Sequence, residues 1–252
     1  MRPVFAIILL AAACDVAAAQ NVPLPRPRPT QAALPTQAPT PEQVAPLSAC
    51  RLRLTTLAVA SSLPPLVGTG ECDVDDVVQL EAVILPDKTR VAVTPPAVLR
   101  CPFAETIVHW VREDVAPALR ELGALKSLDN YASYDCRGRN RVVGAKVSEH
   151  GKGNALDMRS FRLASGKVVG LTDPHVAKDL REGLRRTACA RFATVLGPGS
   201  DGYHENHVHV DLAERRSSYR MCQWDVREPG QEPVAGAAAT QVPLPRPRPS
   251  GV

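Results

Sequence analysis

The chain has 252 residues, of which 44% are hydrophobic, and its formal net charge is +4. This apolar content suffices for a globular domain, and the length suits a single core once the polar ends are set aside. Much of the small net charge comes from arginines near the two ends, so nothing in it indicates a nucleic-acid partner.

The first 19 residues, MRPVFAIILLAAACDVAAA, predict a secretory signal peptide. One arginine precedes a short apolar run, and small residues follow it, as is usual in such segments. The run is too short to anchor the chain across a bilayer. We expect cleavage after Ala19. The alternative is lipoprotein processing at Cys14, although Ala11 stands where such signals usually have Leu. Both interpretations predict a periplasmic or secreted protein.

Residues 20–48 are rich in Pro, Ala, Gln and Thr, and NVPLPRPRPT within them is nearly repeated as QVPLPRPRPSG at 241–251. Alternating prolines favour an extended polyproline II conformation, and such segments bury too little apolar surface to fold. We therefore predict a disordered linker at 20–48, a folded domain at 49–226 and a disordered tail at 227–252. The Pro/Arg ends are spacers, or basic tethers to an anionic wall polymer or membrane surface.

The folded domain begins with a predicted hairpin and a predicted helix. VVQLEAVIL and TRVAVTP flank the turn PDK at 86–88, which is typical of two short antiparallel strands. In residues 101–123, Phe103, Ile107 and Val111 repeat at helical spacing, and Gly123 can end the helix. Pro117 is expected to kink it.

A second helix is predicted over residues 173–188, and the alternating VHVDL at 208–212 predicts a strand. Helices and short strands are mixed without regular βαβ units. The fold class we expect is therefore α+β, with a small antiparallel sheet and flanking helices. His109 and His175 lie on the two predicted helices, and we interpret both as ordinary surface or packing histidines.

Six cysteines follow the signal peptide, and an even number is typical of disulfides formed in an oxidising compartment. The alternatives are scattered buried thiols and a cysteine zinc site, and the latter is weakened because no CxxC pair occurs. Our expectation pairs sequence neighbours, namely Cys50–Cys72, Cys101–Cys136 and Cys189–Cys222.

Two segments carry the residues typical of a metal site. In SEHGKGNALDM, His150 precedes Asp157 by seven residues, and the glycines between them favour a tight loop. In DGYHENHVHVDL, alternation places His207 and His209 on the same face of a strand. Imidazole and carboxylate ligands suit a catalytic zinc with an open position for water. We expect His150, Asp157 and His209 to bind Zn²⁺ in a cleft.

The remaining histidines of this segment are candidates for proton transfer. A metal-activated water needs a group that takes its proton, and a leaving amine needs a donor. Histidine titrates in the range that suits both tasks. His207 and His204 are therefore the catalytic candidates. The alternative interpretation is a surface strand whose histidines are solvated.

The segment SEHGKGNALD matches the pattern Ser-x-His-x-x-Gly-x-Ala-x-Asp at every fixed position, and a His-x-His follows it downstream. In this respect the chain resembles the zinc D,D-peptidases: murein endopeptidases, D-Ala-D-Ala carboxypeptidases, vancomycin-resistance dipeptidases and the related Hedgehog signalling domain. The spacing of the last three histidines is most similar to the penicillin-insensitive murein endopeptidases. SYDCRGRN, SEHGKGNALDMRSF and the Pro-rich flanks resemble the bacterial extensin-like C-terminal domain family over about residues 50–225.

The resemblance implies a Hedgehog/D-Ala-D-Ala peptidase-like fold and assigns roles to single residues. It implies zinc binding by His150, Asp157 and His209, with His207 as base or transition-state donor and His204 assisting it. It also implies substrate contact by Arg137, with Arg139 as the alternative. Ser148 is implied to hold the loop or to contact substrate.

One position departs from the dipeptidase pattern, in which a Glu three residues before the last zinc histidine acts as base. Asn206 stands there and takes no proton, which shifts this role to His207. Glu205 is the alternative base, and Glu149 beside the first ligand is more typical of a supporting or surface residue.

The function we expect is an exported zinc metallopeptidase that cuts peptidoglycan stem-peptide or crosslink bonds near D-Ala. The alternative is a metal-containing cell-wall-binding module that does not cut. A third hypothesis, a structural wall protein that acts through its Pro-rich ends, leaves the SEHGKGNALD match unexplained.

Overall fold

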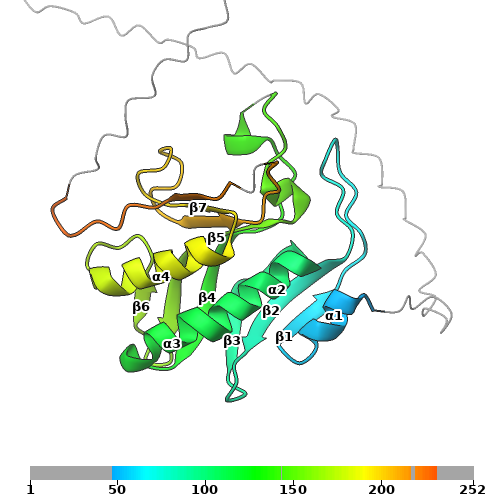
Figure 1. The fold of residues 1–252 in the computed structure, drawn as a ribbon. Helices are drawn as coiled ribbons and strands as arrows, with labels where there is room; N and C mark the ends of the chain where they lie inside the picture. The colour runs from blue at the N-terminus through cyan, green and yellow to red at the C-terminus, as the bar shows by residue number, and fades with distance from the viewer. Residues whose placement is uncertain (1–46, 143, 217–218, 232–252) are drawn as a thin grey trace, which may run out of the picture. The chain divides into compact units, whose positions relative to one another are not determined.

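The computed structural model describes residues 47–142, 144–216 and 219–231 (Figure 1). The expected signal peptide with Cys14, nearly all of the expected linker, and the tail from residue 232 lie outside the described residues. No helix among the described residues is long and apolar enough to cross a membrane.

A nine-stranded sheet forms the centre of the described domain. Its strands run in the order β1-β2-β3-β4-β5-β8-β7-β9, and β6 pairs with β5. Most neighbouring strands are antiparallel, whereas β3–β4 and β7–β9 are parallel. The strands are β1 Ala58–Ser62, β2 Val77–Ile84, β3 Arg90–Arg100, β4 Leu125–Ala132, β5 Ala155–Leu163, β6 Val168–Gly170, β7 Thr194–Leu196, β8 Val208–Asp211 and β9 Met221–Gln223.

The fold mixes helices and strands, and the expected hairpin is confirmed as β2 and β3. The expected antiparallel pairing holds for most neighbouring strands but not for β3–β4 and β7–β9, and the expectation of a small sheet was wrong. Strands β6, β7 and β9 have three residues each, which is too short for alternation to show in the sequence. The two parallel pairings join segments that are not neighbours in the sequence, so no local pattern indicates them.

The helices lie together on one face of the sheet (Figure 1). They are α1 Ala49–Leu54, α2 Cys101–Trp110, α3 Ala116–Leu119 and α4 Lys178–Arg191. A π-helical turn, Val111–Val115, connects α2 to α3. Pro117 lacks an N–H and clashes with a regular preceding turn, so this π turn takes the place of the expected kink.

The two predicted helices are confirmed with changed bounds. The first continues through a 3₁₀ turn, Arg120–Leu122, and ends at Gly123, whose φ is 134°. The second begins at Lys178, later than expected, because Asp173 accepts the backbone N–H of His175 and holds a turn there. His175 is therefore not helical, while His109 on α2 pairs with Glu113 at the surface.

The core lies between the sheet and the helices. Trp110 packs edge-on against Phe192 and at a tilt against Phe161, with ring centroids 5.7 and 6.1 Å apart. Strands β5 and β8 contribute alternate residues to this core, including Leu156 and Val210. Because successive strand residues point to opposite faces, the residues between them project from the face away from the helices.

The disulfides confirm one of the three expected pairings. Cys189–Cys222 forms as expected, but the other four cysteines pair as Cys50–Cys101 and Cys72–Cys136. The expected Cys50–Cys72 and Cys101–Cys136 pairs were wrong. The backbone N–H of Cys101 bonds to the carbonyl of Asp76, which brings the start of α2 beside α1, and Cys72 faces the loop after β4 instead.

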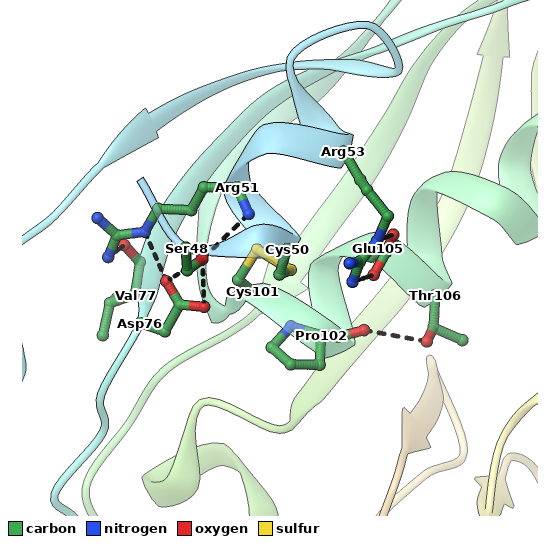
Figure 2. Close-up of a disulfide and its surroundings, with 10 residues drawn as sticks. All are labelled: Ser48, Cys50, Arg51, Arg53, Asp76, Val77, Cys101, Pro102, Glu105 and Thr106. Carbon is green, nitrogen blue, oxygen red and sulfur yellow. Dashed lines mark hydrogen bonds and ion pairs between the residues drawn. A yellow bond between two sulfur atoms is a disulfide. The ribbon is translucent and has the colours of Figure 1, made fainter. Parts of the chain in front are cut away.

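Figure 2 shows how the Cys50–Cys101 bond joins the start of α2 to α1. Ser48 caps α1 by accepting the Arg51 N–H, and its hydroxyl donates to Asp76 at 2.8 Å. Arg51 forms an ion pair with the same carboxylate at 2.6 Å. The two cysteine sulfurs are bonded to each other, so their proximity to Asp76 does not constitute a metal site.

Candidate metal centre

The antiparallel pairing of β5 and β8 brings the two halves of the candidate centre together. Asp157 lies directly opposite His209 in the register of these strands. Neighbouring β8 residues Val208 and Val210 are buried in the core, so His209 projects from the other face of the sheet. A pairing between segments about fifty residues apart thus places an acid beside an imidazole.

His150 reaches the same place from a short 3₁₀ turn, Glu149–Lys152, that leads into β5. Ser148 begins this turn, and its hydroxyl accepts the backbone N–H of His150. Gly153 ends the turn with a φ of 61°, a left-handed conformation that glycine adopts without steric cost. The expected tight loop is therefore confirmed.

The three expected ligands form a compact triangle of donor atoms. His150 Nε2 lies 3.2 Å from both His209 Nδ1 and Asp157 Oδ1, and the last two atoms are 2.9 Å apart. All three residues are buried. This group could hold a metal ion, since each residue offers one ligand atom and these atoms lie within 4.8 Å of one another.

Further hydrogen bonds orient both imidazoles. His150 Nδ1 donates to the carbonyl of Ser133 at 2.7 Å, which directs its Nε2 into the triangle. His209 Nε2 donates to the buried carboxylate of Asp211 at 3.0 Å, which directs its Nδ1 inward. Such partners fix the tautomer and the ring orientation of metal-binding histidines.

The charged forms of Asp157 and His209 stabilise each other. Burial by itself favours a neutral Asp157, but hydrogen bonds from His150 and His209 hold the pKa of this carboxyl well below its usual range. Burial likewise lowers the pKa of His209, yet the carboxylates of Asp157 and Asp211 outweigh it and raise this pKa to about 9. In the metal-free protein a proton on His209 therefore balances the carboxylates.

His207 lies beside the triangle in a different state. Burial lowers its pKa to about 4, so the ring is neutral at neutral pH. Its Nδ1 donates to the side-chain oxygen of Asn206 at 2.8 Å. Its Nε2 is therefore an acceptor, and this atom lies 3.6 Å from Asp157 Oδ2. Asn206 itself takes no proton, but it orients a group that can.

His204 also lies in this cluster, and its Nδ1 donates to Asp201 at 2.7 Å. Its ring centroid is 5.1 Å from that of His207 and 5.5 Å from that of His209. Tyr131 on β4 contacts the cluster from another strand, with its ring 4.9 Å from that of His207. The three histidines of DGYHENHVHVDL are thus brought together.

The candidate substrate residues border the same region. Arg137, Arg139 and Ser148 line a cavity of about 220 Å³ that also exposes His150 and His209. Arg137 donates to Asp135 at 3.0 Å, and the Cys72–Cys136 disulfide fixes the residue before it. All three residues lie where a molecule bound beside the triangle would meet them.

Glu205, the alternative base, and Glu149, interpreted as a supporting or surface residue, both have other contacts. Glu205 is exposed, accepts the backbone N–H of Gly199 at 2.8 Å and pairs with Arg227. It lines none of the cavities at the triangle. Glu149 is buried and accepts a hydrogen bond from Asn154 at 2.6 Å. Neither of them directs a free carboxylate at the triangle.

Sequence reasoning missed three contributors to the centre: Asp211, the Ser133 carbonyl and Tyr131. The alternation of HVHVD carries a signal for Asp211, because it shares a face with His207 and His209. For a carbonyl on a distant loop, or a ring on another strand, the sequence contains no comparable signal.

A protein-family model described as Extensin-like protein C-terminus matches residues 48–223. The match covers well over half of the chain and includes every residue of the candidate centre. No curated protein and no solved structure matches the chain.

Proposed function

The chain belongs to the extensin-like C-terminal family, and from this premise we propose that it is an exported zinc metallopeptidase. Its substrate is peptidoglycan, in which it hydrolyses stem-peptide or crosslink bonds near D-Ala as a D,D-endopeptidase or carboxypeptidase. The observation that carries the proposal is the buried triangle of His150, Asp157 and His209 with a neutral His207 beside it. The resemblance of SEHGKGNALD and HENHVH to the zinc D,D-peptidases supplies the substrate class.

The ligand triangle fits zinc in both chemistry and size. Two imidazole nitrogens and one carboxylate oxygen form a typical catalytic set that leaves a fourth position open. Tetrahedral bonds of about 2.0–2.1 Å require ligand atoms roughly 3.3 Å apart. The three donor atoms lie 2.9–3.2 Å apart, so small adjustments suffice. Calcium takes six to eight oxygen ligands, which these residues do not provide.

His150, Asp157 and His209 would hold the zinc, which would supply a Lewis acid to polarise the scissile carbonyl and acidify a water molecule. His207 takes the proton of the attacking water at Nε2, since Asn206 holds its Nδ1. The water oxygen bonds to the carbonyl carbon, the C–N bond breaks, and His207 returns the proton to the leaving amine. Arg137 donates hydrogen bonds to the developing oxyanion or to a substrate carboxylate. His204, oriented by Asp201, assists His207 or binds substrate.

The proposed location is the periplasm or the outside of the cell. All six cysteines of the described domain form disulfides, which persist in oxidising compartments. The Pro/Arg-rich ends would hold the domain at an anionic wall polymer or membrane surface. Lipidation at Cys14 remains the alternative to cleavage after Ala19.

A second function, a non-catalytic metal-containing wall-binding module, is favoured by one observation. Within the described part of the chain, no glutamate directs a free carboxylate at the triangle, and Glu205 is turned towards Gly199 and Arg227. In this function the metal would stabilise the loop of His150, and His207 would have no chemical role.

The test is a digest of intact sacculi with the zinc-loaded protein, residues 20–252, with products separated by mass. We expect new muropeptides that disappear with a chelator and with Asp157→Ala. His207→Ala should keep its zinc and lose activity by at least a hundredfold, on the scale of general acid–base catalysis. His109→Ala, a surface change, should behave as the parent. Sacculi left intact by a protein holding one zinc per chain would favour the wall-binding module.

A further inference from the structure

A β-bulge in β4 places Tyr131 at the candidate centre. Asn130 pairs with Met158 on β5, and Ala132 pairs with Asp157. Two steps along β4 thus match one step along β5, and Tyr131 is the extra residue. Bulges re-aim side chains and are common beside active sites. Here the bulged ring lies 4.9 Å from the ring of His207 and is 44% exposed.

Arg159 covers the ring of Tyr131. Its guanidinium carbon lies 3.6 Å from the ring centroid, a close cation–π contact. Arg159 is exposed and follows Asp157 by two residues on β5. Among the described residues, no carboxylate lies within ion-pair distance of its guanidinium. Arg159 is therefore a pre-positioned cation whose charge is available to a ligand.

The ligand triangle lies between two cavities. His150 and His209 line the cavity of about 220 Å³, whereas Asp157 and His207 line a second cavity of about 340 Å³. Arg137 and His204 line both, so the cavities adjoin at these residues. Tyr131 forms part of the wall of the second cavity. Arg159 is not part of this wall, but its guanidinium stacks on the Tyr131 ring. An extended molecule lying across the triangle would occupy both cavities.

We propose that the second cavity is a substrate subsite in which Tyr131 and Arg159 bind a carboxylate of an acidic peptide. The bond cut would then be internal, with peptide on both sides of it. This inference rests on the proposed function and narrows it from terminal trimming to internal cleavage. Arg159 reaches a carboxylate about two to three extended residues from the bond at His207.

The charges of the second cavity favour an acidic ligand over a neutral one. Arg137 and Arg141 line it, and both pair with the single carboxylate of Asp135. Asp157 is engaged by the ligand histidines. The arginines around the cavity therefore outnumber the free carboxylates. A sugar is less well suited to stack on Tyr131, because the Arg159 guanidinium already stacks on the tyrosine ring.

The test uses cross-linked muropeptide dimers before and after their carboxylates are converted to amides. Binding is measured by calorimetry on zinc-loaded His207→Ala protein, which holds the ligand without cutting it. The same measurement is made with Arg159→Gln or Arg162→Gln added. Arg162 is also exposed on β5 but contacts the Gly166 carbonyl instead of Tyr131, so it is the matched control. Zinc content is measured in each variant.

We expect the acidic dimers to bind about tenfold tighter than the amidated dimers, which is the scale of one charge-assisted hydrogen bond. Arg159→Gln should reduce this preference to about twofold, and Arg162→Gln should leave it unchanged. Tyr131→Leu should also reduce it, because Arg159 loses its support. Equal preference in the Arg159 and Arg162 variants, or no binding of either dimer, would overturn the subsite.

A kinetic readout separates this inference from the proposed function. With His207 restored, Arg159→Gln should raise KM for dimers severalfold and leave kcat within about twofold, as lost ground-state binding does. Dimers amidated only at the terminal carboxyl should still be cut. Cleavage that requires a free terminal carboxylate would contradict internal cutting, while the metallopeptidase activity itself would stand.

Discussion

Two histidines of the same strand segment differ in protonation because their neighbours differ. His207 and His209 are both buried, and burial favours the neutral form of both. Burial lowers the pKa of His207 to about 4, and the nearby Asp157 carboxylate offsets this only in part. His209 has a pKa raised to about 9, because its two nitrogens face the carboxylates of Asp157 and Asp211. One is suited to accept a proton and the other to exchange its proton for a metal.

The Asp211 carboxylate is expected to support metal binding without touching the metal. Asp211→Asn should weaken zinc affinity about 10- to 100-fold, because the amide orients His209 less strongly and lowers its basicity. Affinity is measured by competition with a chelator. Asp87→Asn, on the hairpin turn far from the centre, should match the parent. Equal affinities in the two variants would remove Asp211 from the metal site.

Zinc binding should depend on pH through His209. Metal binding must displace the Nδ1 proton, so apparent affinity should rise up to about tenfold per pH unit and level off near pH 9. The stability of the metal-free protein depends on pH in the opposite sense and falls as pH rises. The raised pKa of His209 stabilises the fold, and this contribution is fully present below the unfolded-state pKa of about 6.5. It is lost as pH rises through the folded-state pKa of about 9.

The measurement is the zinc dissociation constant between pH 6.5 and 9, alongside the unfolding free energy of the metal-free protein. Asp157 does not change charge in this range, because its pKa is held well below its usual value. Affinity that is constant over the range would show that His209 carries no proton at its Nδ1 in the metal-free state.

At the scale of elements, the turn Glu149–Lys152 determines where His150 lies, and Gly153 determines how the turn ends. A Cβ on Gly153 would come within 3.0 Å of the Arg100 nitrogen and 3.1 Å of a Val74 methyl. Gly153 also has a positive φ, so a side chain there meets both strain and crowding.

Gly153→Ala should lower the free energy of unfolding by about 3 kcal/mol, combining left-handed strain with this crowding. Gly166→Ala is the matched control, since Gly166 also has a positive φ but nothing within 4 Å of its Cβ position. Its loss should be about 1 kcal/mol, from strain alone. Urea unfolding measures both, and equal losses would rule out the crowding at Gly153.

At the scale of the molecule, the disulfides connect segments that the centre needs. Cys72–Cys136 closes a separation of 64 residues and holds the loop that carries Arg137. Cys189–Cys222 closes a separation of 33 residues and joins α4 to β9. Disulfides that close loops of these lengths reduce the conformational entropy of the unfolded chain by similar amounts.

Two double variants distinguish an effect of a disulfide on stability from an effect on activity. Cys72→Ser/Cys136→Ser and Cys189→Ser/Cys222→Ser should each lose about 4 kcal/mol of unfolding free energy. Only the first should raise KM for muropeptides, because it frees Arg137, while zinc content stays the same in both. Thermal unfolding and steady-state kinetics provide the comparison. A KM increase of equal size in both variants would indicate general loosening.

Local patterns in the sequence determined much of this protein. Helical spacing around Phe103 and Ile107, the β2–β3 hairpin, the glycine turn after His150 and the alternation of VHVDL all appear in the structure as expected. These features depend on residues within a few positions of each other, so composition and period suffice to indicate them. The grouping of His150, Asp157 and His209 was expected from ligand chemistry and the family pattern.

Only the tertiary structure decided how distant segments meet. The register that sets Asp157 opposite His209, the bulge that directs Tyr131 at His207, and the pairing of Cys50 with Cys101 join segments some 25 to 75 residues apart. Many pairings of such segments satisfy the same local patterns. The one that forms is selected by burial of the whole core and the sheet order, which no short stretch of sequence contains.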